Sequence, residues 1–276
     1  MDSSAMQPHH QFVVDRFIAT CQADARIVAA FLGGSYARGA ADAHSDLDLY
    51  LITADEAHAN FCAAREAFMR LLGEPLFLED FNLPDIVFFI FADGTEGELG
   101  LGRESRFMHI HDGPYKILLD KKNILADAVF PARETAPSKQ RETLRKQIYW
   151  FWHELSHFIT AMARGQLWWA YGQLEALRRH SVTLARLRHD FAADAGDDES
   201  YFKVEKALPI ALLSPLRETF CPQERAAMLR AAHIIFQFYR EQAMALASAH
   251  GVTYPTQLEW VMVERLKNLE FDRAMD

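Results

Sequence analysis

The sequence predicts an α+β protein in which a mixed sheet flanked by helices is followed by a helical bundle. In the first half, short apolar runs typical of strands alternate with helical patterns, whereas the second half repeats almost entirely with helical period. The change falls near residue 135, in a segment with two prolines and no periodicity. We therefore expect two domains, residues 1–135 and residues 136–276.

Elements of the first half follow from local patterns. Residues 9–24 form an amphipathic pattern typical of a helix, and 55–72 predict a second helix. Asp93-Gly94 supplies the positive φ that a tight turn requires, so the apolar runs on either side predict a hairpin. The expected strands are 26–32, 46–52, 85–91, 96–101 and 115–120.

The second half predicts a bundle. Ser138 follows a proline and is expected to cap a long helix that ends near Gly165. Residues 192–200, rich in acid and small residues, predict a solvated connection. Further helices are expected at 166–190, 199–208, 222–250 (after Pro222) and 255–270.

Composition narrows the class of protein. The chain has 276 residues and a net charge of -9, which is the wrong sign for broad contact with a phosphate backbone, so we expect no nucleic-acid partner. Three widely spaced cysteines suit reduced thiols and a cytoplasmic location. Since no apolar run approaches the roughly 18 residues of a membrane span, and no export signal is visible, we also expect no membrane partner.

The segment 31–52 carries the strongest chemical signal. One predicted strand ends in Gly33-Gly34-Ser35, and the next opens with Asp46-Leu47-Asp48. Residues two apart in a strand project to the same side, so the two aspartates converge and can hold a divalent metal. Glycines permit close approach of a phosphate, and a helix that begins just after Ser35 would point free N–H groups at it.

This pattern resembles the nucleotidyltransferase superfamily of DNA polymerase beta type, in which a Gly-Ser turn precedes Asp-x-Asp by about ten residues. Arg38-Gly39 also fits the pattern. The resemblance implies that Gly34, Ser35 and Arg38 bind the nucleotide and that Asp46 and Asp48 bind Mg²⁺. Such sites have a third carboxylate on a neighbouring strand, for which Glu98 is the candidate as metal ligand or as base; Glu96, two residues earlier, is the alternative.

Further segments resemble bacterial antibiotic nucleotidyltransferases. They include DIVFFIFADGTEGELGL, YKILLDKKNIL and YWFWHELSHFITAMARGQLWWAYGQLEALRRH. The chain is similar to lincosamide nucleotidyltransferases and aminoglycoside 6-adenylyltransferases, which have an N-terminal nucleotidyltransferase domain and a C-terminal helical domain for substrate binding. The resemblance implies transfer of a nucleoside monophosphate, AMP from ATP or from another nucleoside triphosphate, to a hydroxyl of a small molecule such as an aminoglycoside or lincosamide. It is also compatible with a homodimer.

Two alternatives remain open. His153, Glu154 and His157 match H-E-x-x-H on a predicted helix, where the histidines share a face and could bind zinc for a hydrolase. No third ligand stands at an obvious spacing. The second alternative is a protein that uses the nucleotidyltransferase fold on a macromolecular partner.

Overall fold

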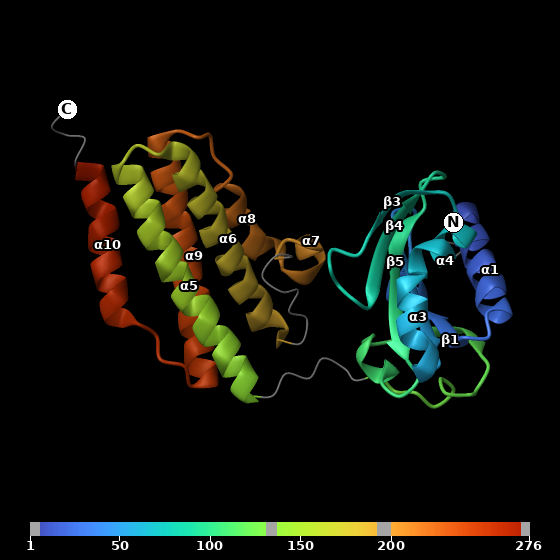
Figure 1. Cartoon of the computed structure of the whole chain (residues 1–276). Helices are drawn as coiled ribbons and strands as arrows, with labels where there is room; N and C mark the ends of the chain where they lie inside the picture. The colour runs from blue at the N-terminus through green and yellow to red at the C-terminus, as the bar shows by residue number, and fades with distance from the viewer. Residues whose placement is uncertain (1–5, 131–136, 192–199, 272–276) are drawn as a thin grey trace. The chain divides into compact units, whose positions relative to one another are not determined.

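The computed structural model describes residues 6–130, 137–191 and 200–271 (Figure 1). The chain divides into two compact units, Met1–Arg133 and Glu134–Asp276, and each is described here by itself. The predicted linker covers residues 130–137, of which 131–136 lie outside the described residues, as do 192–199 of the predicted connection at 192–200. In the described part, no helix is long and apolar enough to cross a bilayer.

The N-terminal unit contains a six-stranded mixed sheet in the order β3-β4-β5-β2-β1-β6. β2 and β5 run parallel, and the other neighbouring strands are antiparallel. The sheet confirms the predicted strands and the 85–101 hairpin. It also contains the edge strand β3, which the sequence analysis missed because its apolar residues do not alternate with polar ones; Leu76 and Phe77 are both exposed. The strands are β1 (Ile27–Leu32), β2 (Leu47–Thr53), β3 (Pro75–Glu79), β4 (Ile86–Phe91), β5 (Glu96–Arg103) and β6 (Lys116–Asp120).

One predicted helix of this unit differs in the structure. The helix predicted over 55–72 is broken at Ala64, which leaves helical geometry. The break lets the buried rings of Phe61 and Phe68 meet at 5.2 Å between centroids, closer than the roughly 10 Å rise that separates residues seven apart in a continuous helix. The helices are α1 (Pro8–Ala23), α2 (Gly34–Ala37), η1 (Asp55–Ala57), α3 (His58–Ala63), α4 (Arg65–Leu72) and η2 (Phe107–His109).

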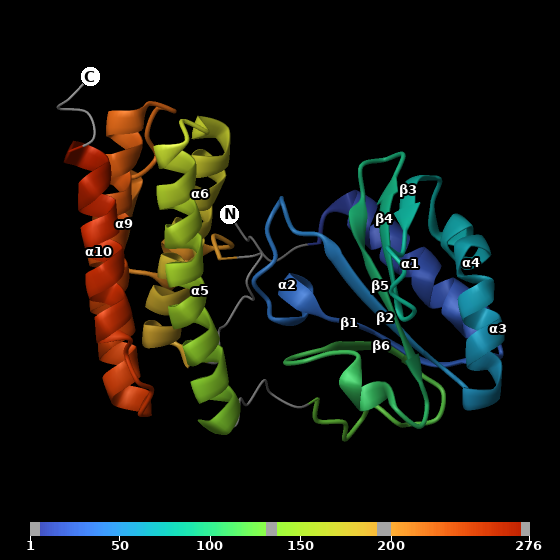
Figure 2. The same ribbon diagram turned by 60° about the vertical axis from the view of Figure 1, so that its left-hand side comes forward.

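The two faces of this sheet are covered differently. Helices α1, α3 and α4 lie on one face, where Leu47, Leu49 and Leu51 of β2 join the larger core (Figures 1 and 2). The other face carries a smaller cluster around Phe31 and Tyr50, whose rings stack at 4.8 Å. Alternation along β2 therefore sends leucines into the core and leaves Asp48 and Tyr50 on the less covered face.

The C-terminal unit is a helical bundle, as predicted, with local differences. Helix α5 already includes Pro137, so Ser138 is not its cap. The helix expected at 199–208 is reduced to four residues, and α9 begins after Glu224 rather than at Pro222. Helix α8 was missed because Pro215 within it indicates a break. The helices are α5 (Pro137–Ala163), α6 (Leu167–His189), α7 (Val204–Ala207), α8 (Ile210–Arg217), α9 (Arg225–His250) and α10 (Thr256–Phe271).

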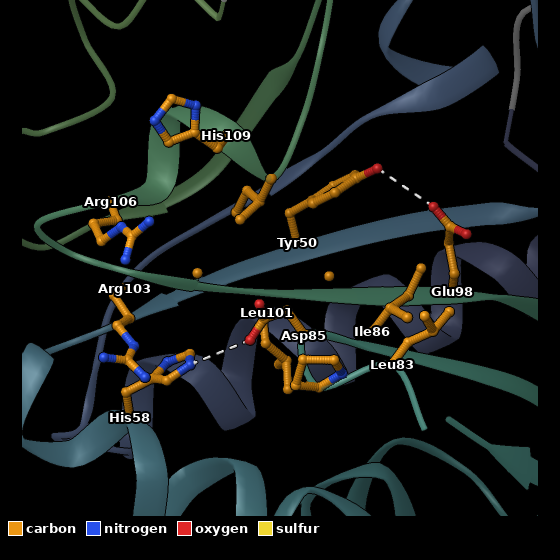
Figure 3. A pocket seen from close by; sticks show the side chains of 14 residues that line it. Tyr50, His58, Leu83, Asp85, Ile86, Glu98, Leu101, Arg103, Arg106 and His109 are labelled. Carbon is orange, nitrogen blue, oxygen red and sulfur yellow. Dashed lines mark hydrogen bonds and ion pairs between the residues drawn. The ribbon is translucent and has the colours of Figure 1, made fainter. Parts of the chain in front are cut away.

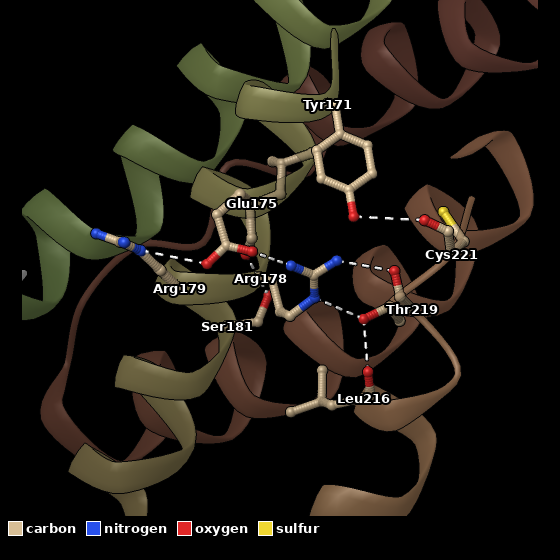
Figure 4. Close-up of polar contacts among 9 residues, drawn as sticks. Tyr171, Glu175, Arg178, Arg179, Ser181, Leu216, Thr219 and Cys221 are labelled. Carbon is tan, nitrogen blue, oxygen red and sulfur yellow. Dashed lines mark hydrogen bonds and ion pairs between the residues drawn. The ribbon is translucent and has the colours of Figure 1, made fainter. Parts of the chain in front are cut away.

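A buried arginine ties α6 to the segment after α8. Arg178 is only 1% exposed; its Nε donates to Thr219 Oγ1 at 2.7 Å and its Nη2 to the Thr219 carbonyl at 2.8 Å (Figure 4). It also forms an ion pair with Glu175, and its guanidinium lies 4.1 Å from the Phe220 ring centroid. The buried charge is thus paired and hydrogen-bonded, which buried charges require.

Candidate active site

The sheet brings the predicted carboxylates together through the one parallel strand pair among the described strands. In the register of β2 and β5, Asp48 lies opposite Glu98 and Leu47 opposite Gly97. Directly paired residues of neighbouring strands project to the same face, so the side chains of Asp48 and Glu98 lie side by side. Asp46 immediately precedes β2 and is exposed. The sequence pattern therefore located the ends of β2 and β5 that carry the carboxylates. Only the resemblance to nucleotidyltransferases indicated that these two strands lie side by side.

The glycine-serine turn is hydrogen-bonded to β2 and packs against it. The N–H of Gly33 donates to the Asp48 carbonyl at 2.9 Å. Gly34 has a φ of 54°, and a Cβ at this position would overlap the Asp48 carboxylate. Glycine is required here for both reasons, since other residues avoid this conformation and the carboxylate occupies the space of a side chain. Helix α2 begins at Gly34, one residue before Ser35 rather than after it.

Acidic neighbours change the titration of Glu98. Burial raises the pKa of Glu98 above its usual range, and the negative charges of Asp48 and Asp46 raise it further. The Tyr50 hydroxyl donates to Glu98 Oε1 at 3.4 Å, and burial followed by the Glu98 and Asp48 charges raises the pKa of Tyr50 as well (Figure 3). The three carboxylates thus concentrate negative charge in one place.

Tyr50 is a site residue that the sequence analysis missed. A signal was present, because Asp46, Asp48 and Tyr50 follow one another at intervals of two and so share a face of the strand. In the structure its ring packs on Phe31 while its hydroxyl reaches Glu98.

The other predicted phosphate-binding residues, Ser35 and Arg38, lie on or at the end of the short helix α2 that begins at Gly34. Ser35 Oγ is buried and has no hydrogen-bond partner among the described residues, which leaves a donor available for a ligand. Arg38 is exposed at the C-terminal end of α2. Tyr36, the residue after Ser35, is hydrogen-bonded to His10 of α1, with 2.6 Å between the tyrosine hydroxyl and His10 Nδ1.

The donor set fits a hard cation. All three candidate ligands are carboxylates, and Mg²⁺ binds through one or two carboxylates while it keeps several waters. No group of three or more histidine, cysteine or acidic side chains in the described part is gathered closely enough to hold a metal by itself. Water and substrate oxygens would therefore complete the shell around Asp46, Asp48 and Glu98.

The H-E-x-x-H residues lie on α5 in the other unit. The rings of His153 and His157 are 4.3 Å apart between centroids, and His157 Nδ1 lies 4.0 Å from a Glu154 carboxylate oxygen. His157 also lies 5.7 Å from the Trp169 ring. The described residues bring no third metal-ligating side chain to this pair.

The mixed sheet, with its Gly-Ser turn beside the Asp-x-Asp strand, has the features that the resemblance to nucleotidyltransferases implied. The chain matches the model of the streptomycin adenylyltransferase family over residues 9–269, and it belongs to this family. The protein is therefore an antibiotic nucleotidyltransferase with a nucleotide as co-substrate.

A solved structure of an aminoglycoside 6-adenyltransferase from Bacillus subtilis is similar to this chain with a TM-score of 0.42 and 16% identity. The match covers 96% of this chain and 99% of the other. No curated protein matches the chain. The family assignment rests on the family model.

Proposed function

We propose that the protein transfers AMP from ATP to a hydroxyl of an aminoglycoside or lincosamide antibiotic, with Mg²⁺ bound and pyrophosphate released. The observation that carries this proposal is the register of β2 and β5, which sets Asp48 opposite Glu98 next to Gly34. Family membership supports the nucleotidyl transfer, and the oxygen-only donor set supports the metal. The three cysteines are free, which supports a cytoplasmic setting.

Gly34, Ser35 and Arg38 bind the phosphates of the nucleotide in this proposal. The bare backbone at Gly34 lets a phosphate come close, and the unpartnered Ser35 hydroxyl can donate to a phosphate oxygen. Arg38 adds a positive charge at the solvent side.

Asp46 and Asp48 hold Mg²⁺ in this proposal, and Glu98, opposite Asp48 on the neighbouring strand, is the third carboxylate at this end of the sheet. When bound, the ion offsets the negative charge of the triphosphate and of the leaving pyrophosphate. Burial raises the pKa of Glu98, and the negative charges of Asp48 and Asp46 raise it further; this second contribution supports a cation as the neighbour of the three carboxylates.

Glu98 accepts the proton of the acceptor hydroxyl as that oxygen attacks the α-phosphorus. Its raised pKa brings the carboxylate closer to the ideal strength of a general base near neutral pH. Tyr50 orients the carboxylate through its hydroxyl.

A direct assay tests the proposal. Purified protein is incubated with each nucleoside triphosphate and a panel of aminoglycosides and lincosamides, and pyrophosphate release is followed with Mg²⁺ or with EDTA. We expect release that depends on Mg²⁺, on ATP and on one of the antibiotics, with the AMP-modified drug identified by mass. Release that persists in EDTA contradicts the metal assignment, and release with no acceptor from the panel contradicts the acceptor class.

A further inference from the structure

A cavity of about 520 Å³ lies beside Glu98, and apart from Glu98 and Tyr50 the residues that line it have no part in the roles described above. It is bounded by β5, by the start of β4 with the residues before it, and by the segment after β5 (Figure 3). Its volume falls within the roughly 300–1,000 Å³ of small-molecule sites. Glu98 and Tyr50 form one end, so a ligand in the cavity reaches the group that is proposed to accept the proton.

The middle of the cavity is apolar because Tyr50 and Ile110 pack against two glycines of β5. A Cβ on Gly100 would lie 2.5 Å from the Tyr50 ring, and a Cβ on Gly102 would lie 2.7 Å from Ile110. Glycine at these positions lets both side chains lie flat on the strand. Leu83 and Ile86 add further apolar lining. The cavity therefore suits the hydrocarbon or ring body of a small molecule.

The end away from Glu98 is basic. Figure 3 shows the side chains of Arg103 and Arg106 on this side of the cavity. Both are exposed, and among the described residues neither makes a side-chain hydrogen bond or ion pair. Asp85, the acidic group at this end, lies 3.6 Å from His58 Nε2 and is 61% exposed. Two unpaired guanidinium groups form a fork-shaped donor array that matches a carboxylate or phosphate.

We propose that this cavity admits a further class of acceptor, namely small hydroxyl compounds that carry a carboxylate or another anionic oxygen group. The anionic group binds Arg103 and Arg106, the apolar body lies over Tyr50 and Ile110, and the hydroxyl meets Glu98. The proposal rests on the proposed function and extends it beyond cationic antibiotics.

The reaction would follow the course already given for the antibiotic. The hydroxyl oxygen forms a bond to the α-phosphorus of ATP, and the bond from that phosphorus to the bridging oxygen of pyrophosphate breaks. Pyrophosphate leaves with the bonding electron pair, and the hydroxyl proton passes to Glu98. The product is an AMP ester of the anionic compound.

A pair of probes with the same shape and opposite charge tests the site. Binding of para-(hydroxymethyl)benzoate and of para-(hydroxymethyl)benzylamine to the full chain is measured by ligand-detected NMR without nucleotide. We expect the benzoate to bind and the benzylamine to bind at least tenfold more weakly. In the double variant Arg103→Gln, Arg106→Gln the benzoate should lose at least tenfold in affinity.

The matched control is the double variant Arg16→Gln, Arg70→Gln, which removes the same charge from exposed positions on α1 and α4. It should bind the benzoate like the wild type, and thermal melts establish that both double variants are folded. Equal binding of the two probes, or equal loss in both double variants, overturns the proposal.

Pyrophosphate release with ATP and the benzoate then tests the acceptor role. Release that is lost in the Arg103/Arg106 variant, while its affinity for ATP is unchanged, supports the proposal. Arginine-dependent binding without release, in an enzyme that still modifies an antibiotic, overturns the acceptor role alone. Absence of release with every acceptor means that the proposed function has failed as well, and the two failures are thereby distinguished.

Discussion

The carboxylate of Asp48 lies against the backbone of Gly34, in the space that a Cβ on residue 34 would occupy. The same glycine has a φ of 54°. The glycine-serine turn, which is proposed to bind phosphate, and the strand whose aspartates are proposed to bind metal are thus packed together without any side chain between them. Any side chain at position 34 must displace the carboxylate or the turn.

Gly34→Ala is therefore expected to lower turnover by roughly 10²-fold or more, the effect of misplacing a reactive group by about 1 Å. The matched control is Gly165→Ala, where φ is 67° and a Cβ would meet nothing within 4 Å. The control should melt at a lower temperature because of backbone strain but keep its turnover. Steady-state kinetics beside thermal melts make the comparison, and equal turnover in the two variants would contradict the packing argument.

Asp46→Asn and Asp48→Asn are each expected to reduce nucleotide transfer to background. Without metal, their melting temperatures should equal or exceed that of the wild type, because removing one carboxylate relieves repulsion in the cluster. Turnover at saturating Mg²⁺ and melts in EDTA provide the two readings. Near wild-type turnover in either variant would remove that residue from the metal site.

Glu98→Gln separates a base from a metal ligand. If Glu98 accepts the proton, kcat should fall by roughly 10² to 10⁴ while affinity for Mg²⁺ and nucleotide changes little. Calorimetric titration beside turnover measures both quantities. Weakened nucleotide binding would instead assign Glu98 to the metal, and the control Glu96→Gln, at an exposed neighbour, should retain activity. Intact turnover in Glu98→Gln with loss in Glu96→Gln would transfer the role.

The raised pKa of Glu98 also predicts a pH dependence of stability in the absence of metal. The folded state binds the proton of the Glu98 carboxyl more tightly than the unfolded state does. The stability that this proton adds to the folded state is therefore fully present below the unfolded pKa near 4.5 and is lost as the pH rises through the folded pKa. Glu98→Gln should consequently melt above the wild type at neutral pH in EDTA, with the difference vanishing near pH 4. A constant difference over this range would contradict the cause given for the shift.

His153 and His157 test the zinc alternative. Replacing both with glutamine is expected to leave nucleotide transfer within about tenfold, a change of about 1.4 kcal/mol. Elemental analysis should find no stoichiometric zinc in the purified protein. One tightly held zinc per chain, together with a peptidase activity that the double variant loses, would favour the hydrolase.

Arg178→Ala should destabilise the helical unit by about 3–5 kcal/mol, because it leaves Thr219 and Glu175 without the charge that they surround. Arg179→Ala is the matched control: Arg179 is 44% exposed and pairs with the same glutamate, so about 0–1 kcal/mol is expected. Urea unfolding curves measure both. Equal effects would mean that the buried hydrogen bonds contribute little.

The sequence predicted the layout of the sheet well where residues alternate regularly. Asp46 and Asp48 could be placed on one strand face, and the Asp93-Gly94 turn identified the hairpin. The parallel pairing of β2 with β5 depends on contacts between segments about 50 residues apart, which no local pattern encodes. The same holds for the Tyr50 hydroxyl and for the unpaired Arg103 and Arg106, whose significance lies in a cavity formed by several segments.

The register of β2 and β5 has a consequence for length changes in the chain. Because successive side chains of a strand face opposite ways, inserting or deleting one residue between Asp93 and Glu98 would turn the carboxylate toward the leucine-rich core and place Leu99 or Gly97 in its position. The length of the short β4–β5 turn thus determines which residue of β5 lies opposite Asp48. Substitution of the exposed Glu96 should be tolerated, whereas single-residue insertions and deletions in this segment should be eliminated in a selection for activity.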